Sequence, residues 1–138
     1  MGKFEFIETT ADVGVLAFGK SLKEVFTHTA EGLFSLMAAL EDIKKTTRIS
    51  FCSEGDSLET LLVNWLNELI YILDTNSFLA REIDIKELTH KKISGDLWGE
   101  EIDRERHRLG TEAKAATYHN LSIKKNKGNW MIKVIFDV

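Results

Sequence analysis

The sequence predicts an α+β protein in which two helices pack on one face of a largely antiparallel β-sheet. Two segments carry apolar residues at helical spacing, and most of the others show the period-two alternation of strands. The later strands follow one another as hairpins without intervening helices, which favours antiparallel pairing. The 138 residues show no repeat and no linker, so we expect a single domain over residues 1–138, built as one pair of layers.

The first half of the chain is expected to hold three strands and two helices. Ser21 and Glu24 form a capping box, in which the two side chains satisfy free backbone donors at a helix N-terminus. A second capping signal at 56–59 precedes a helix that is apolar around more than half of its circumference, so we expect other elements on both sides of it. Asn64 and Asn67 are expected on an exposed edge of this helix. The expected order is strand 3–8, strand 13–18, a helix from 21 to about 39, strand 47–53 and a helix from 58 to about 75.

The second half is expected to hold four strands. Gly128 supplies the positive φ that a tight loop at 126–128 needs, so the last two strands form the clearest hairpin. In the final strand the even-numbered residues from 130 to 136 lie on one side, and the residues between them lie on the other. The expected strands are 78–88, 91–98, 118–125 and 129–138.

The composition favours a cytoplasmic protein with little direct nucleic-acid binding. The formal net charge is −4 and the pI is about 5.6, whereas proteins that hold RNA usually show a basic face and a high pI. Cys52 is alone and can form no disulfide within the chain, which fits a reducing compartment. The N-terminus lacks the apolar core of a signal peptide, and no apolar stretch approaches the ~20 residues that span a bilayer.

A polar segment at 99–109 interrupts the predicted strands and is a candidate functional loop, although a solvated charged loop is the plainer interpretation. Glu100 and His107 within it, and Lys114 and His119 beyond it, are groups that can contact a phosphate or a partner. For Lys114 the alternative is an ordinary ion pair, and for His119 it is a place on the inner face of its strand. No zinc-binding helix, phosphate-binding loop or nucleophile elbow accompanies these residues.

Two acidic residues stand at strand ends. Asp12 follows three small residues between the first two strands, and Asp137 is the next-to-last residue of the sequence. If these strands meet, both carboxylates converge with the carboxylate or carbonyl of Val138; otherwise each is an ordinary solvated strand end. Oxygen donors without nitrogen or sulfur suit Ca²⁺ or Mg²⁺ and not zinc. A cation would also relieve the repulsion between clustered carboxylates.

The motifs resemble those of the archease family over essentially the whole chain. Residues 8–14, Glu-Thr-Thr-Ala-Asp-Val-Gly, resemble the family's opening motif, in which histidine normally stands at the position of Thr9. The helical segment 61–69, the polar segment continuing into 112–119, and the C-terminal segments 128–130 and 134–138 are similar to the remaining family motifs. The resemblance implies an archease-like fold.

The resemblance also implies a function. Archease proteins activate the RtcB-type tRNA-splicing RNA ligase, because they promote guanylylation of its active-site histidine and repeated turnover, and they broaden its nucleotide use. They bind a divalent cation, usually Ca²⁺, through residues that correspond to Asp12, Asp137 and Val138; Mg²⁺ and Mn²⁺ are alternatives. Thr9 departs from this pattern, so any contribution of the usual histidine must be met by a hydroxyl or lost.

We therefore expect a non-catalytic, metal-binding helper of the ligase, in which Glu100, His107, Lys114 and His119 contact the partner or its phosphate. Two alternatives remain. A chaperone-like modulator of a tRNA methyltransferase would bind that enzyme without affecting ligation. A metal-dependent phosphoesterase would use Asp12, Asp137 and His107 catalytically and would hydrolyse RNA or nucleotides unaided.

Overall fold

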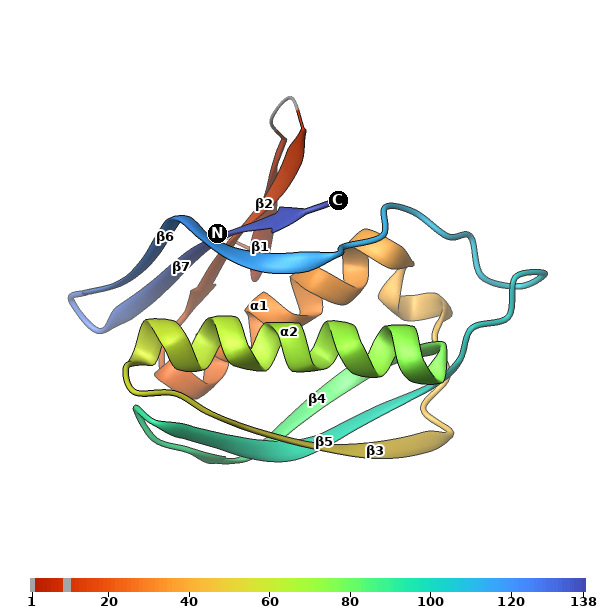
Figure 1. The fold of residues 1–138 in the computed structure, drawn as a ribbon, viewed down its shortest axis with the longest axis horizontal. Coiled ribbons are helices and arrows are strands. Elements are labelled where there is room, and N and C mark those ends of the chain that lie inside the picture. Colours follow the sequence, from red (N-terminus) through yellow and green to blue (C-terminus); the bar gives the residue numbers. More distant parts are fainter. Residues whose placement is uncertain (1, 9–10) are drawn as a thin grey trace.

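The computed structural model describes residues 2–8 and 11–138, and Figure 1 shows the fold. The predicted helices and strands are present, and their ends differ from the expected ones by a few residues. Helix η1, a short 3₁₀ helix after the first α-helix, was not predicted. The elements are β1 (Phe4–Glu8), β2 (Asp12–Gly19), α1 (Leu22–Met37), η1 (Leu40–Asp42), β3 (Thr47–Glu54), α2 (Leu58–Asn76), β4 (Phe78–Leu88), β5 (Lys92–Glu101), β6 (Ala115–Asn126) and β7 (Asn129–Asp137).

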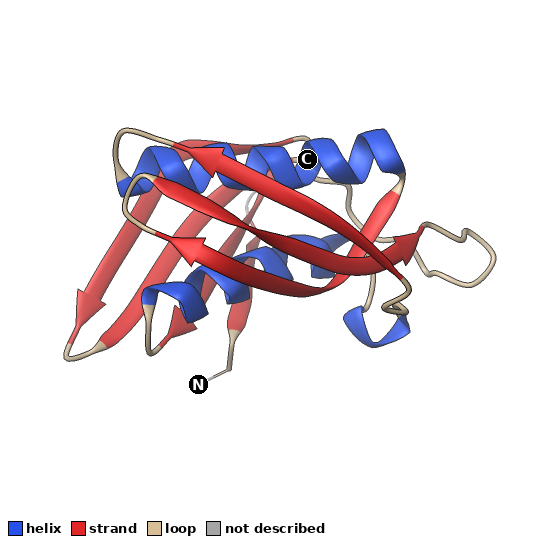
Figure 2. Ribbon diagram, turned by 90° about the horizontal axis from the view of Figure 1, so that it is seen from below, coloured by secondary structure: helices blue, strands red, loops and turns tan. Residues whose placement is uncertain are grey.

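The strands form two antiparallel sheets, with both helices in contact with both of them (Figures 1 and 2). One sheet has the order β1-β2-β7-β6, and the other has the order β3-β5-β4. The predicted α+β class with antiparallel pairing is confirmed, but the predicted single sheet with helices on one face is not observed. Helix α2 is apolar around much of its circumference, so it needs cover on two sides, and β3 and β6 lie against it.

Trp65 of α2 stands at the centre of the core. Its side chain is fully buried, stacked on Phe26 of α1 at a ring-centroid distance of 5.6 Å and tilted against Phe51 of β3 at 5.5 Å. These contacts join the two helices to the three-stranded sheet. Aromatic side chains bury the largest apolar areas of any residues, so this cluster dominates the energetics of packing between these layers.

The helix N-termini are capped by serine side chains. Ser21 Oγ accepts a hydrogen bond from the Glu24 N–H at 3.1 Å, as the capping box predicts, while Glu24 Oε1 accepts from the Lys20 N–H at 3.1 Å. For α2 the cap is Ser57, whose Oγ accepts from the Thr60 N–H at 3.1 Å. Each cap satisfies backbone donors that the first helical turn leaves open.

The β6–β7 hairpin fixes the two faces of the four-stranded sheet. Lys127 and Gly128 have φ of 52° and 81°, the left-handed pair that a two-residue hairpin turn requires. Beyond this turn Ile132, Val134 and Phe136 are buried on the side of the helices, as predicted. The residues between them lie on the opposite side, which we call the outer face. None of the described helices combines the length and hydropathy of a membrane-crossing segment.

Candidate metal and partner site

Strand pairing brings the two predicted aspartates together at one end of the four-stranded sheet. Asp12 of β2 lies directly opposite Asp137 of β7, and Ala115 of β6 lies opposite Asp137 on its other side. The Lys114 N–H donates a hydrogen bond to the Asp137 carbonyl at 2.8 Å. Opposed residues of antiparallel strands project to the same face, with Cβ atoms about 5 Å apart. Asp12 and Asp137 therefore meet at this rim, as the cation hypothesis requires, with Val138 next to Asp137 in the sequence and Lys114 beside them.

The donors at this rim fit a divalent ion that is open to solvent. Asp137 and Val138 are exposed and Asp12 is partly exposed, so an ion there would remain accessible. Two opposed carboxylates repel each other across the strands, which a cation would offset. Ca²⁺ takes six to eight oxygen ligands, yet no group of three histidine, cysteine or acidic side chains gathers anywhere in residues 2–8 and 11–138. Water or a partner would have to supply the remaining ligands. Thr9 lies outside the described residues.

Glu100 and His107 bind each other inside the protein. Glu100 Oε2 accepts hydrogen bonds from the Lys44 N–H at 2.7 Å and from His107 Nε2 at 2.9 Å, and Arg106 donates to the other carboxylate oxygen. His107 Nδ1 accepts from the Asp103 N–H at 2.9 Å, so the ring proton must lie on Nε2, facing Glu100. The His107 side chain is 0% exposed. In this structure its ring nitrogens are occupied by the protein and not presented to a phosphate.

This partly buried ion network keeps Glu100 charged. Burial by itself would raise the pKa of Glu100, but the hydrogen bonds from Arg106, the Lys44 N–H and His107 together lower it to about 2. The same contact with Glu100 raises the pKa of Arg106 above its ordinary value. Glu100 is therefore ionised, and its carboxylate accepts the hydrogen bonds that join the other residues of the network.

The network fastens the polar loop that follows β5. Arg106 Nη1 donates to the Asp42 carbonyl at 2.7 Å, and the Gly110 N–H donates to the Met37 carbonyl at 2.7 Å, which satisfies an open carbonyl at the end of α1. The loop thus leads from the network to Lys114 at the carboxylate rim. Glu100 and His107 serve this structural role, while Lys114 and His119 are exposed and their contact with a partner stays a prediction.

His119 is exposed, so its expected alternative place on the inner face is wrong. The pairing of β6 with β7 is irregular between Thr117 and Ser122, and Asn120 adopts a positive φ of 53°. An irregularity of this kind breaks the alternation of faces on which the expectation relied. No glycine marks the position, so the sequence offered little sign of it.

Asn67 is a contact that the sequence interpretation missed. Its Oδ1 accepts from the Ala116 N–H at 2.7 Å and its Nδ2 donates to the Ala116 carbonyl at 3.3 Å, so the amide pairs with the edge of β6 as another strand would. Asn64 instead donates to the Glu54 carbonyl at 2.8 Å. The expected exposed edge is therefore partly a contact surface, and an asparagine within an apolar helix was the signal available.

Fold and site together define a small α+β protein with two sheets, two enclosed helices and a pair of carboxylates at an open rim. The model of the Archease protein family (MTH1598/TM1083) matches residues 4–138. A protein archease from Pyrococcus abyssi is 36% identical over 142 residues, covering 100% of both chains. The chain belongs to the archease family.

Solved structures agree with this assignment. The solution structure of Methanobacterium thermoautotrophicum protein 1598 matches with a TM-score of 0.78 and 34% identity, covering 100% of both chains. A crystal structure from Thermotoga maritima, described as an archease and possible chaperone, matches with a TM-score of 0.67 and 22% identity, covering 96% of this chain and 94% of that one. The latter supports the fold.

Proposed function

We propose that this protein is a non-catalytic activator of an RtcB-type RNA ligase, and that it acts by holding a divalent cation, Ca²⁺ in the first instance, at Asp12, Asp137 and Val138. Membership of the archease family supports the partner. The observation that carries the proposal is the register of β2 and β7, which sets Asp12 directly opposite Asp137.

The open rim suits an ion that is shared with a partner. Asp12 and Asp137 hold only part of a coordination shell, and phosphate oxygens at the ligase active site are ligands of the kind that would complete it. A divalent ion supplies charge neutralisation for phosphoryl transfer, which otherwise depends mainly on positioning. Lys114, exposed beside the rim, adds a positive charge for the same phosphate. The ion network around Glu100 holds the polar loop that leads to Lys114, and so helps to position this lysine.

Guanylylation of purified ligase, with and without this protein, tests the proposal. We expect faster accumulation of guanylylated ligase and repeated ligation turnover with the wild type, and loss of both with Asp137→Asn, because one cation ligand loses its charge. Asp74→Asn is the matched control, since Asp74 is an exposed aspartate on α2. A wild-type protein that leaves guanylylation unchanged would reject the proposal.

The structure weighs against the phosphoesterase alternative. That function needs an acid–base group at the cation, and the histidine named for it, His107, is buried and engaged by Glu100 and the Asp103 N–H. The methyltransferase alternative predicts a different result in the same laboratory test: the protein would bind and alter a tRNA methyltransferase while ligation stayed unchanged.

A further inference from the structure

The outer face of the four-stranded sheet is not covered by the helices. Helix α1 contacts β2 and β7 on the opposite face, where Val15, Ala17 and Val134 are fully buried. On the outer face, alternation along the paired strands places Asp12, Gly14, Leu16 and Phe18 opposite Asp137, Ile135, Lys133 and Met131. The carboxylate rim is therefore one end of a continuous surface that runs the length of β2 and β7.

The middle of this surface holds a small apolar cluster that is separate from the main core. Ile135 is 4% exposed, yet it is not one of the residues that form the contiguous core. A Cβ at Gly14 would lie 2.9 Å from Ile135 Cδ1 and 3.3 Å from Ile7 Cβ, so the missing side chain lets the two isoleucines close over β2. Leu16 extends the cluster and is partly exposed. A solvent-facing sheet normally alternates to polar side chains, whereas this one carries a closed apolar cluster in which only Ile7 and Leu16 are partly exposed.

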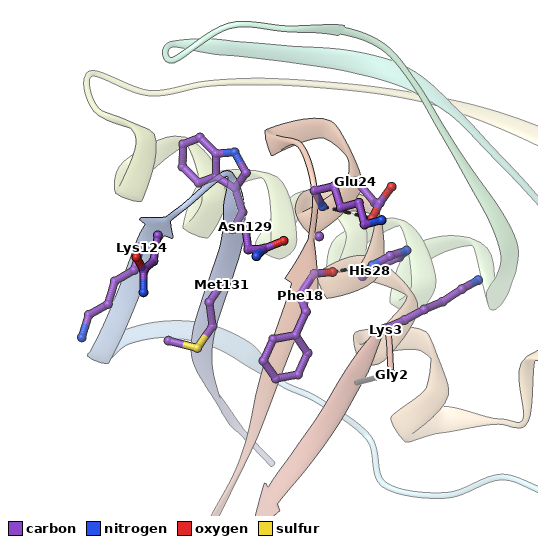
Figure 3. A pocket seen from close by; sticks show the side chains of 12 residues that line it. Gly2, Lys3, Phe18, Glu24, His28, Lys124, Asn129 and Met131 are labelled. Carbon is purple, nitrogen blue, oxygen red and sulfur yellow. Dashed lines mark hydrogen bonds between the residues drawn. The ribbon is translucent and has the colours of Figure 1, made fainter.

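The end opposite the carboxylates opens into a hollow of about 730 Å³ (Figure 3). Phe18 and Met131 of the outer face form part of its wall, together with Trp130. Glu24 and His28 also line it, but the former binds the Lys20 N–H and the latter lies 2.6 Å from the Phe18 carbonyl through Nδ1. The hollow is large enough for a protruding side chain of a bound protein.

Lysines dominate the charge around the hollow. Lys20 and Lys124 line it and Lys133 stands between it and the carboxylate rim; none of the three forms an ion pair within the described part of the chain. The protein as a whole is acidic, with a formal net charge of −4. The outer face thus has Asp12 and Asp137 at one end, an apolar strip flanked by the exposed Glu5 of β1 in the middle, and lysines towards the other end. It complements a partner surface that is acidic around an apolar protrusion at the lysine end.

We infer that the outer face, from Asp12 and Asp137 to the hollow at Phe18 and Met131, is the surface on which the RNA ligase docks. The inference rests on the proposed function for the identity of the partner. Two arguments favour a protein over RNA: the strip is mainly aliphatic, and the net charge is unfavourable to a polyanion. Docking of a second copy is less favourable, because it would cover the carboxylate rim that must stay accessible to the ligase.

Charge reversal on the strip tests the inference. Met131→Glu and Lys133→Glu place an acidic group against the acidic partner surface, so we expect each to weaken binding to purified ligase by about tenfold or more. Tyr71→Glu on α2 and Lys91→Glu on the β4–β5 turn are the matched controls, because both wild-type residues are exposed and neither belongs to the four-stranded sheet. Ca²⁺ binding by the free protein, measured by calorimetry, should match the wild type in all four variants.

The outcomes separate this inference from the proposed function. If the wild type activates the ligase and both outer-face variants bind it as tightly as the wild type, the docking surface is wrong and the function stands. If the wild type neither binds nor activates the ligase, both are overturned. If the wild type is a dimer in light scattering and Met131→Glu dissociates it, the face serves self-association. If Lys133→Glu loses RNA binding while its ligase binding is unchanged, the face binds RNA. Either result overturns the inference. Should Met131→Glu fail to fold, Lys133→Glu alone decides.

Discussion

The carboxylate rim and the partly buried ion network both contain acidic residues, but the two regions hold them in opposite ways. At the rim, Asp12 and Asp137 face each other at an open sheet end. In the network, Glu100 is largely shielded from solvent, paired with the Arg106 guanidinium and hydrogen-bonded to the neutral His107 ring. The difference teaches that similar acidic side chains can lie at an open sheet end in one region and be held by the protein's own donors in another. Stability measurements can test this contrast directly.

Removal of the Glu100 carboxylate should have the largest effect. Glu100→Ala leaves the buried His107 Nε2–H and the Lys44 N–H without their acceptor, which we expect to destabilise the protein by about 3 kcal/mol. Urea unfolding measures this loss. Glu101→Ala, at the exposed neighbouring position, should change the free energy of unfolding little. Equal effects of the two variants would show that the network does not stabilise the loop.

Acid should weaken the network next. The pKa of Glu100 is lowered from 4.5 to about 2 in the folded protein, so its contribution to stability is fully present above pH 4.5 and is lost as the pH falls towards about 2. Urea unfolding across this pH range should therefore show a steeper loss of stability for the wild type than for Glu100→Gln, which has no carboxylate to protonate. Parallel curves would contradict the role assigned to Glu100.

Calcium should affect the rim alone, and by the smallest amount. At a Ca²⁺ concentration tenfold above its dissociation constant, binding stabilises the wild type by about 1.4 kcal/mol. Asp137→Asn should lose this calcium-dependent stabilisation. Glu100→Gln should keep it, although its stability without calcium should be lower than that of the wild type. Thermal unfolding with Ca²⁺ and with EDTA measures both. A calcium response that survives Asp137→Asn would place the ion elsewhere.

The sequence predicted the elements well, because periodicity and capping are local properties. It placed α1 from apolar spacing and the Ser21 capping box, α2 from apolar spacing and a capping signal at 56–59, where the cap is Ser57, and β4 at its observed bounds. It did not predict the division into two sheets, since pairing of β2 with β7 and of β3 with β5 depends on contacts far apart in the chain. For the same reason, the sequence did not predict the surroundings of site residues that contact segments far away in the chain.

In the candidate site, the aspartates were identified from the sequence, whereas the surroundings of the histidines were not. Asp12 and Asp137 were identified from their positions at strand ends, and the register then brought them together. His107 was taken for a partner contact because its neighbours in sequence are polar, whereas its burial depends on Glu100 and on the Lys44 backbone beyond it. For His119, predicted as a partner contact, only the alternative inner-face position is wrong, because the irregularity in β6 left no mark in the residue types.

The pairing of β2 with β7 also has a consequence for biosynthesis. The aspartate of β2 is made early and the aspartate of β7 more than a hundred residues later, so a nascent chain that lacks β7 has only half of the rim. Affinity for a divalent ion should therefore appear only once the sheet has closed, which would make ion binding a report on completed folding.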